Sequence, residues 1–183
     1  MTSNPVTRRE ASVRLFSIFP LMSVAGVALP TAEGASASNK DISRNCECIH
    51  QEVRFSASPS RLYKTLTDAR QFGNATESIM PGSAASTVIS PHVGGEFCMF
   101  KGIILGRHIE MVPNVRLVQA WREKDWEPGI YSVVRFQLNF QSSGTQLVFD
   151  HKGFPQGAAD HLSVGWKSHY WDSLQKYLAE PQK

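Results

Sequence analysis

The polar residues that could catalyse a reaction are few and scattered along the 183-residue chain. Asp150 and His151 are adjacent on a predicted strand, where neighbouring side chains point to opposite faces, so they cannot act together. Glu123 and Asp125 come nearest to a carboxylate pair for acid–base catalysis, but their place in a turn favours solvated side chains. The sequence contains no glycine-rich phosphate loop, HExxH or GxSxG motif. We therefore predict no catalytic residues and a protein that is not an enzyme.

The three cysteines give little indication of a metal or redox site. Cys46 and Cys48 are two residues apart and Cys98 stands alone, so the CxxC spacing of metal and redox motifs is missing. We predict no metal ion and no cofactor. In an oxidising compartment, Cys48 with Cys98 is the first disulfide to expect, and the alternative is that all three are free thiols.

Inward positions of the predicted strands are better candidates for a binding site than any of these groups. Alternation along each strand places one set of side chains on the inner face, where the C-terminal helix adds two aromatic residues. Core packing is the simpler interpretation of each apolar member, and ligand contact is the alternative. The candidate cavity residues are Phe97, Met99, Leu117, Gln119, Trp121, Val134, Phe136, Phe149, His151, Trp166 and Tyr170.

Gln119 and His151 are the two polar members of this candidate set. A polar side chain on an inward face needs a hydrogen-bond partner. A buried backbone group or water is the commoner partner, and a ligand is the alternative. If the domain encloses a cavity, these residues are its natural polar contacts, because apolar pockets orient ligands with a few polar groups.

A sheet and two short helices are predicted to position these side chains. Apolar and polar residues alternate over 49–55, which predicts a strand. Ser58-Pro59 is a typical helix start, and it predicts a helix to about residue 68. A short helix is predicted next over 69–72, ended by Gly73 and Asn74. Short apolar runs between turn residues then predict strands near residues 86–90, 96–101, 103–111, 115–123, 131–140 and 145–151.

The last predicted element is a long amphipathic helix over residues 158–179. Its apolar stripe follows steps of three and four residues and consists of Leu162, Trp166, Tyr170, Leu174, Tyr177 and Leu178. A curved antiparallel sheet with one uncovered face can be covered by such a helix, which predicts an α+β fold with room for a cavity between the two.

Composition and charge set limits on the class of protein. The chain has 42% hydrophobic and 19% charged residues, as expected for a globular domain. Its net charge is +3, and it contains no block of like charges. The sequence therefore does not suggest a nucleic-acid partner. No run of eighteen apolar residues occurs, so no membrane-spanning helix is expected in the mature chain.

The first 37 residues have the order of an export signal. Arg8-Arg9 resembles a twin-arginine pair, an apolar run follows, and small residues precede a cleavage point after Ala37. The alternative is a disordered extension without a targeting role. We predict a signal over 1–37, a linker over 38–47, the folded domain over 48–179 and a tail over 180–183. Export would make the protein periplasmic or secreted; otherwise it is cytoplasmic.

Five segments along the chain carry motifs that occur in a fixed order. The most telling segment is residues 112–129, which has a proline turn, a strand ending in Trp121-Arg122, and a second tryptophan before a Pro-Gly turn. The other segments are Phe55 to Asp68, the Gly94-Gly95 strand opening, the Gly144-Thr145 hairpin strand, and Gly165-Trp166 with Tyr170-Trp171 at the start of the last helix. Together and in this order, they resemble the family named for activators of the heat-shock protein 90 ATPase.

The resemblance implies a helix-grip fold of the START-like (SRPBCC) superfamily, whose members hold apolar ligands between sheet and helix. It implies a non-enzymatic domain that binds an apolar or amphipathic small molecule in that cavity. The alternative that it implies is a stress-response co-chaperone module that binds and activates the heat-shock protein 90 ATPase. A third hypothesis is an enzyme that uses the cavity, and it requires a clustered acid–base pair.

Overall fold

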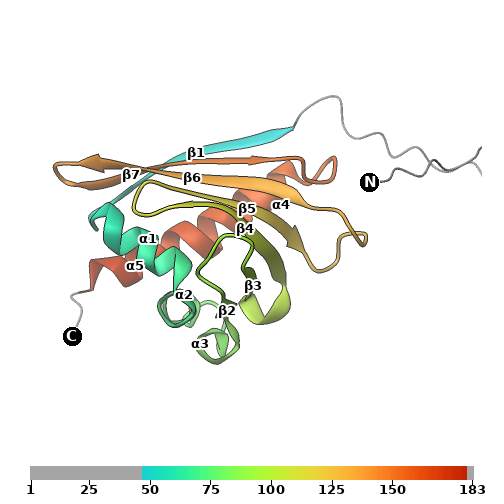
Figure 1. Cartoon of the computed structure of the whole chain (residues 1–183), viewed down its shortest axis with the longest axis horizontal. Helices are drawn as coiled ribbons and strands as arrows, with labels where there is room; N and C mark the ends of the chain where they lie inside the picture. Colours follow the sequence, from blue (N-terminus) through green and yellow to red (C-terminus); the bar gives the residue numbers. More distant parts are fainter. Residues whose placement is uncertain (1–46, 181–183) are drawn as a thin grey trace, which may run out of the picture. The chain divides into compact units, whose positions relative to one another are not determined.

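A curved antiparallel sheet wraps around a long C-terminal helix in the computed structural model, which describes residues 47–180 (Figure 1). The seven strands are ordered β1-β7-β6-β5-β4-β3-β2. They are β1 (Cys48–Phe55), β2 (Val88–Ile89), β3 (Glu96–Met99), β4 (Ile104–Val112), β5 (Arg116–Glu123), β6 (Ser132–Gln141) and β7 (Gly144–Lys152). The helical elements are α1 (Pro59–Thr67), α2 (Ala69–Thr76), α3 (Ser83–Ser86), the 3₁₀ turn η1 (Phe100–Gly102), α4 (Ala159–Gly165), the π-helical turn η2 (Trp166–Trp171) and α5 (Asp172–Ala179).

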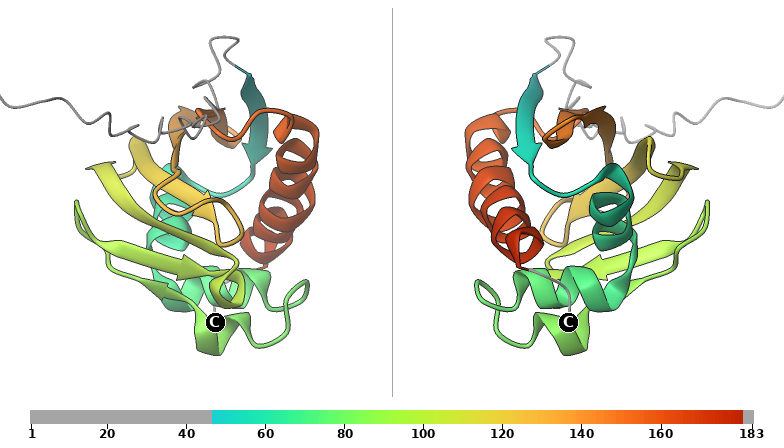
Figure 2. Two further views of the ribbon diagram at one scale, coloured as in Figure 1. Left: turned by 90° about the vertical axis from the view of Figure 1, so that its right-hand side faces the viewer. Right: turned by 90° about the vertical axis from the view of Figure 1, so that its left-hand side faces the viewer.

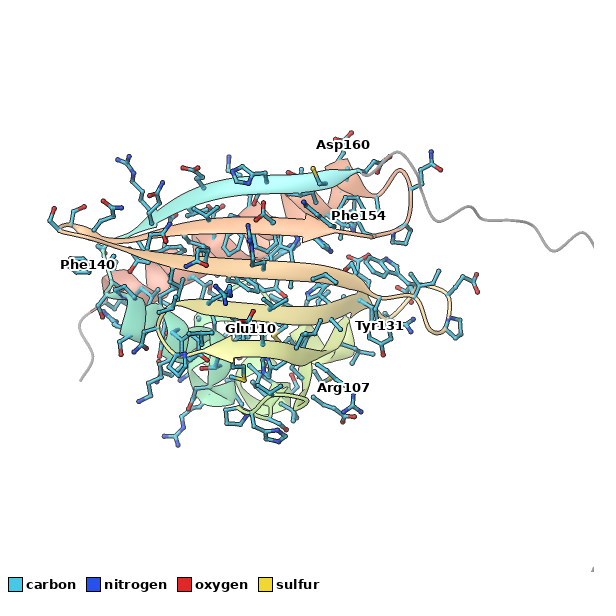
Figure 3. All side chains as sticks on the ribbon, turned by 45° about the horizontal axis from the view of Figure 1, so that its top comes forward. Arg107, Glu110, Tyr131, Phe140, Phe154 and Asp160 are labelled. Atoms are coloured by element: carbon cyan, nitrogen blue, oxygen red, sulfur yellow. The ribbon has the colours of Figure 1, made fainter. Side chains whose placement is uncertain are left out.

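The predicted α+β helix-grip fold is confirmed, with one face of the sheet against the helix. Figure 2 shows the sheet curving around the helix formed by α4, η2 and α5, with α1 and α2 beside it. Buried and exposed residues alternate along β5, β6 and β7, so the inner face forms the core. On the opposite face, Arg135 and His50 both contact Asp150 from neighbouring strands. At the hairpin end of β6, Phe140 is 75% exposed (Figure 3).

The two short helices after β1 are present, but the second is longer than predicted. Ser58 caps α1 through its side chain, which accepts a hydrogen bond from the Arg61 N–H. The prediction that Gly73 ends α2 is wrong, because the helix continues to Thr76. A β-carbon at Gly73 would lie 2.8 Å from the Cα of Ala84 in α3. The glycine thus allows the two helices to approach closely and does not end the first.

Two predicted strands near the sheet edge are also shorter than expected. Of the strand predicted at 86–90, only Val88–Ile89 forms a strand, β2, and Ser86 is the last residue of α3. The strand predicted at 96–101 ends at Met99, because Phe100, Lys101 and Gly102 all have positive φ. These three left-handed residues make the turn η1, and this turn also contributes a wall of the pocket described below.

The predicted C-terminal helix is present, with a π-helical turn in its middle. A π turn adds one residue to a helical turn and shifts the stripe that faces the core. Tyr170 and Trp171, which are consecutive, are consequently both buried. The 3.6-residue period predicts Tyr170 but not Trp171, whose Nε1 donates to the Oε1 of Gln51 in β1 at 2.5 Å.

The expected Cys48–Cys98 disulfide is wrong. Cys48 begins β1 at one edge of the sheet, and Cys98 lies in β3 with four strands between them. Strands about 4.8 Å apart place the two roughly 24 Å apart along the sheet, whereas disulfide-bonded Cα atoms lie about 6 Å apart. Both thiols are free. Cys46, the signal at 1–37 and most of the 38–47 linker lie outside the described residues.

Candidate functional site

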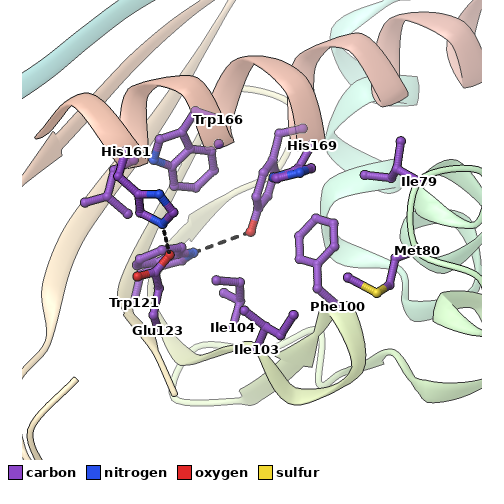
Figure 4. A pocket seen from close by; sticks show the side chains of 13 residues that line it. Ile79, Met80, Phe100, Ile103, Ile104, Trp121, Glu123, His161, Trp166 and His169 are labelled. Atoms are coloured by element: carbon purple, nitrogen blue, oxygen red, sulfur yellow. Dashed lines mark hydrogen bonds and ion pairs between the residues drawn. The ribbon is translucent and has the colours of Figure 1, made fainter. Parts of the chain in front are cut away.

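An apolar pocket of about 180 Å³ opens between the C-terminal helix and the ends of β4 and β5 (Figure 4). Three separate parts of the chain form its walls: the segment after α2, the region of η1, β4 and β5, and the helix from α4 into η2. The residues that line it are Ile79, Met80, Phe100, Ile103, Ile104, Trp121, Glu123, His161, Leu162, Gly165, Trp166, His169 and Tyr170.

The helix wall depends on Gly165, the last residue of α4 before the π turn. Its backbone is helical, and a β-carbon placed on it would meet only the Nδ1 of His169, at 3.8 Å. The missing side chain therefore leaves open space on the pocket side of the helix. Trp166 and Tyr170, one and five residues later, form the aromatic part of this wall, with their rings 4.1 Å apart.

The opposite wall includes Phe100 from the left-handed turn η1. A bulky residue at a φ of 51° is a rare backbone conformation, and such strain is found at ligand-binding sites. The turn brings the buried Phe100 ring to 5.1 Å from the ring of Tyr170 and 5.5 Å from that of Phe72. Regular strand alternation after Met99 would have placed Phe100 on the outer face. The strained turn thus supplies one side of the pocket.

The hydroxyl of Tyr170 belongs to a buried residue of the pocket lining. It accepts a hydrogen bond from the Nε1 of Trp121 at 3.4 Å, drawn as a dashed line in Figure 4. Burial raises the pKa of Tyr170, the nearby negative charge of Glu123 raises it further, and the bond from Trp121 opposes both. The phenol therefore keeps its proton at neutral pH.

Glu123 and His161 lie at the rim of the pocket, where they join β5 to α4. The Nε2 of His161 is 3.3 Å from the Oε1 of Glu123, and the Nε1 of Trp126 donates to its Oε2 at 3.2 Å. Glu123 is therefore not the solvated turn residue that its sequence suggested, since 23% of its side chain is exposed, whereas Asp125 is 84% exposed. The His161 side chain is 75% exposed, which suits a rim contact between helix and sheet better than a shielded acid–base pair.

His151 belongs to a buried chain of hydrogen bonds beneath the helix. The Nε1 of Trp166 donates to its Nδ1 at 3.0 Å, so the neutral ring carries its proton on Nε2 and donates to the Oγ of Ser132 at 2.7 Å. Ser132 donates in turn to the backbone oxygen of Trp121 at 2.9 Å. Burial lowers the pKa of His151 to about 3. Both ring nitrogens thus have side-chain partners, and neither is a backbone group as the commoner interpretation expected.

Gln119 faces a second buried histidine. The Nε2 of Gln119 is 3.4 Å from the Nδ1 of His108, its cross-strand partner on β4. The Nε2 of His108 is buried without a hydrogen-bond partner among residues 47–180. Burial, and secondarily the charge of His92, lowers the pKa of His108 to about 4. Gln119 is thus satisfied by another side chain of the core.

All eleven candidate cavity residues are buried, but only three of them line the pocket: Trp121, Trp166 and Tyr170. The space beneath the middle of the helix is filled by closely spaced aromatic rings, and Phe149 lies 4.3 Å from Trp166. The remaining eight residues belong to this filled interior: Phe97, Met99, Leu117, Gln119, Val134, Phe136, Phe149 and His151. Whether any of the eleven contacts a ligand stays a prediction.

Several of the pocket residues that the sequence did not indicate lie on or beside irregular segments. Ile79 and Met80 follow α2, and Phe100 and Ile103 flank or form the left-handed turn. Gly102 signals a turn in the sequence, but nothing there signals that Phe100 turns inward.

Residues 47–180 contain no cluster of three or more His, Cys, Asp or Glu side chains able to hold a metal ion. In the same span, no helix is long and apolar enough to cross a membrane.

The domain that holds this pocket matches a known protein family. Residues 56–179 match the family described as "Activator of Hsp90 ATPase homolog 1-like protein". The chain belongs to this family. The human activator of 90 kDa heat shock protein ATPase homolog 1 is 24% identical over 131 residues, which cover 72% of this chain but 36% of the human protein. The chain therefore matches about a third of the length of this curated relative.

Solved structures of similar proteins have the same fold. An HSP90 activator from Plasmodium falciparum is 25% identical, with a TM-score of 0.63, and the match covers 75% of this chain and 99% of that one. A protein from Mesorhizobium loti is 21% identical, with a TM-score of 0.61 over 75% of this chain and all of its own. The predicted family and fold are thus confirmed, and membership is compatible with a ligand-binding or a co-chaperone module.

Proposed function

We propose that this domain is a non-enzymatic binding protein for a small, mainly apolar molecule held in the pocket between α4–η2 and β4–β5. The observation that carries the proposal is the pocket itself, whose walls are mainly aromatic and aliphatic and which includes few polar groups. Ligand sites in proteins typically combine such walls with a small number of placed polar groups. The left-handed turn at Phe100 and the π turn at Trp166–Trp171 both contribute walls, and both are unusual backbone features that concentrate at functional sites.

The pocket volume sets the size of the ligand. Drug-sized ligands occupy pockets of roughly 300–1,000 Å³, whereas an engineered apolar cavity of about 150 Å³ binds benzene. At about 180 Å³, this pocket suits a molecule with one ring or a short chain. Closely packed aromatic rings next to the pocket do not favour a ligand with a long lipid tail.

Filling the pocket from Gly165 is expected to abolish binding without unfolding the domain. The side chain of Gly165→Leu would enter the open space on the pocket side of the helix. Replacing a helical glycine also stabilises the helix by about 0.5–1 kcal/mol. We expect α-methylstyrene at about ten times its Kd to raise the Tm of the wild type by roughly 3–6 °C, and the Tm of Gly165→Leu by much less.

Gly165→Ala is the matched control, since it gains most of the helix stabilisation while adding a single methyl group. It should keep most of the ligand-induced shift. Failure of α-methylstyrene, toluene and indole to raise the wild-type Tm would contradict the proposed function, and so would equal shifts in the wild type and in Gly165→Leu.

A co-chaperone module that binds and activates the heat-shock protein 90 ATPase is the second candidate. The supporting observation is that the Plasmodium falciparum structure, described as an HSP90 activator, is matched over 99% of its length. This function is tested by measuring ATP hydrolysis by heat-shock protein 90 of the same host with and without the domain. Stimulation that persists in Gly165→Leu would assign the activity to the surface and separate it from the pocket.

Export remains a proposal, and it bears on which of these functions the cell uses. A twin-arginine-like signal over 1–37 would place the protein in the periplasm or outside the cell. The mass of the protein purified from its own host tests this proposal, because cleavage after Ala37 gives a chain that begins at Ser38. An uncut chain would instead favour the cytoplasm and a chaperone partner.

A further inference from the structure

The hydroxyl of Tyr170 has a proton with no acceptor among residues 47–180. This oxygen accepts from the Nε1 of Trp121, and no side-chain or backbone oxygen of the described residues accepts from it. The residue is 4% exposed, so bulk water does not readily satisfy the donor. A buried phenol normally finds a partner for its O–H. An unpaired donor on a residue that lines an apolar pocket is a group that a ligand can satisfy.

The second observation concerns the charge that the ligand can carry. Glu123 lies at the rim of the same pocket, and its negative charge acts on the Tyr170 hydroxyl. Both of its oxygens are already engaged, by His161 and by Trp126, so it is held in place and not offered as a new partner. An anionic ligand would be repelled by this carboxylate as it enters the pocket. It would also lose its hydration in an apolar site, and both effects weaken its binding.

We propose that the pocket selects small neutral molecules with one hydrogen-bond-accepting oxygen, such as an aryl ketone, with the Tyr170 hydroxyl donating to that oxygen. The apolar body of the ligand lies between Phe100, Ile104 and Trp166, and the Nε1 of Trp121 holds the phenol oxygen in place. This inference rests on the proposed function and adds the ligand class to it. A hydrocarbon would fill the walls but leave the donor unpaired, whereas a carboxylate would pair with the donor but be repelled at the rim.

The test uses two ligands of nearly the same shape. Acetophenone carries a C=O where α-methylstyrene carries a C=CH₂, and their Kd values can be measured by calorimetry on the full chain at pH 8. We expect Tyr170→Phe to raise the Kd of acetophenone by roughly threefold to tenfold, since one neutral hydrogen bond is lost. The Kd of α-methylstyrene should stay within about twofold of its wild-type value. Benzoate should bind more weakly than acetophenone.

Tyr63→Phe is the matched control, because it removes the hydroxyl of another buried tyrosine, on α1 and outside the pocket lining. It should change neither Kd. An infrared spectrum of acetophenone bound to the wild type supplies a second test that needs no variant: the carbonyl stretch should lie below its frequency in a hydrocarbon solvent.

The possible results separate the two proposals. Equal effects of Tyr170→Phe on both ligands, an unshifted carbonyl stretch, or benzoate binding as tight as that of acetophenone would overturn the inference while the apolar pocket stands. Absence of binding by both ligands to the wild type would overturn the proposed function as well. A selective loss of acetophenone affinity in Tyr170→Phe, with Tyr63→Phe unchanged, supports the inference.

Discussion

Replacement of Trp166 by alanine is expected to lower the free energy of unfolding by about 5 kcal/mol. Trp166 is 2% exposed and lies at the centre of the aromatic interior, in contact with Trp121, Phe149 and Tyr170. Truncating a buried tryptophan costs about 3–5 kcal/mol through lost burial and the cavity left behind. The Nδ1 of His151 would also lose its donor, and an unpaired buried group costs about 1–3 kcal/mol.

Guanidinium-induced unfolding measures this change in the free energy of unfolding. Two further variants serve as comparisons. Trp166→Phe keeps a ring but removes the indole N–H, so it should cost about half as much. Trp126→Ala removes a partly buried tryptophan at the rim and should cost about 1–2 kcal/mol, because less buried area is lost. If Trp166→Ala were no more destabilising than Trp126→Ala, the aromatic interior would not hold the helix on the sheet as described.

The domain is expected to lose about 3–4 kcal/mol of stability between pH 7 and pH 5. Burial lowers the pKa of His151 to about 3 and, with a smaller contribution from His92, that of His108 to about 4. In the unfolded chain both titrate near 6.5. Below pH 6.5 the unfolded state therefore binds more protons than the folded state, so stability falls with pH until the folded pKa values are reached. Each histidine contributes about 2 kcal/mol over this interval.

One exposed histidine acts in the opposite direction. The hydrogen bond to Asp150 raises the pKa of His50 in the folded state. The folded state is therefore stabilised as the pH falls and this histidine becomes protonated. Because the His50 side chain is exposed to solvent, this opposing effect is weak. The pH dependence is measured by guanidinium unfolding at pH 5, 6 and 7. His108→Leu removes one of the two titrating groups, so its loss of stability should be about half that of the wild type. An unchanged slope in this variant, or none in the wild type, would contradict the assignment.

The regular parts of the fold could be predicted because their periods are simple. Alternation along β5 and β7 placed Leu117, Trp121 and Phe149 inward, and all three are buried. The spacing of Leu162, Trp166 and Tyr170 predicted the core-facing stripe of the helix in the same way. In each of these elements, backbone geometry fixes which side chains share a face.

The pocket itself could not be predicted, because it depends on departures from those periods. The π turn adds a residue that no 3.6-residue pattern contains, and Phe100 adopts a positive φ that its residue type disfavours. Gly73 was interpreted as a helix end, although its role is close packing against α3. Periodicity also does not reveal that aromatic rings fill much of the interior beneath the helix and that open space lies beside Gly165.

The most direct test of a ligand-binding pocket is a methyl NMR titration with the isoleucine δ1 groups labelled. Ile79, Ile103 and Ile104 line the pocket, whereas Ile49 and Ile89 are buried elsewhere in the domain. Addition of acetophenone to the wild type should shift the first three signals in a saturable manner and leave the other two in place. Shifts of equal size at Ile49 and Ile89, or none at Ile103 and Ile104, would contradict binding at this site.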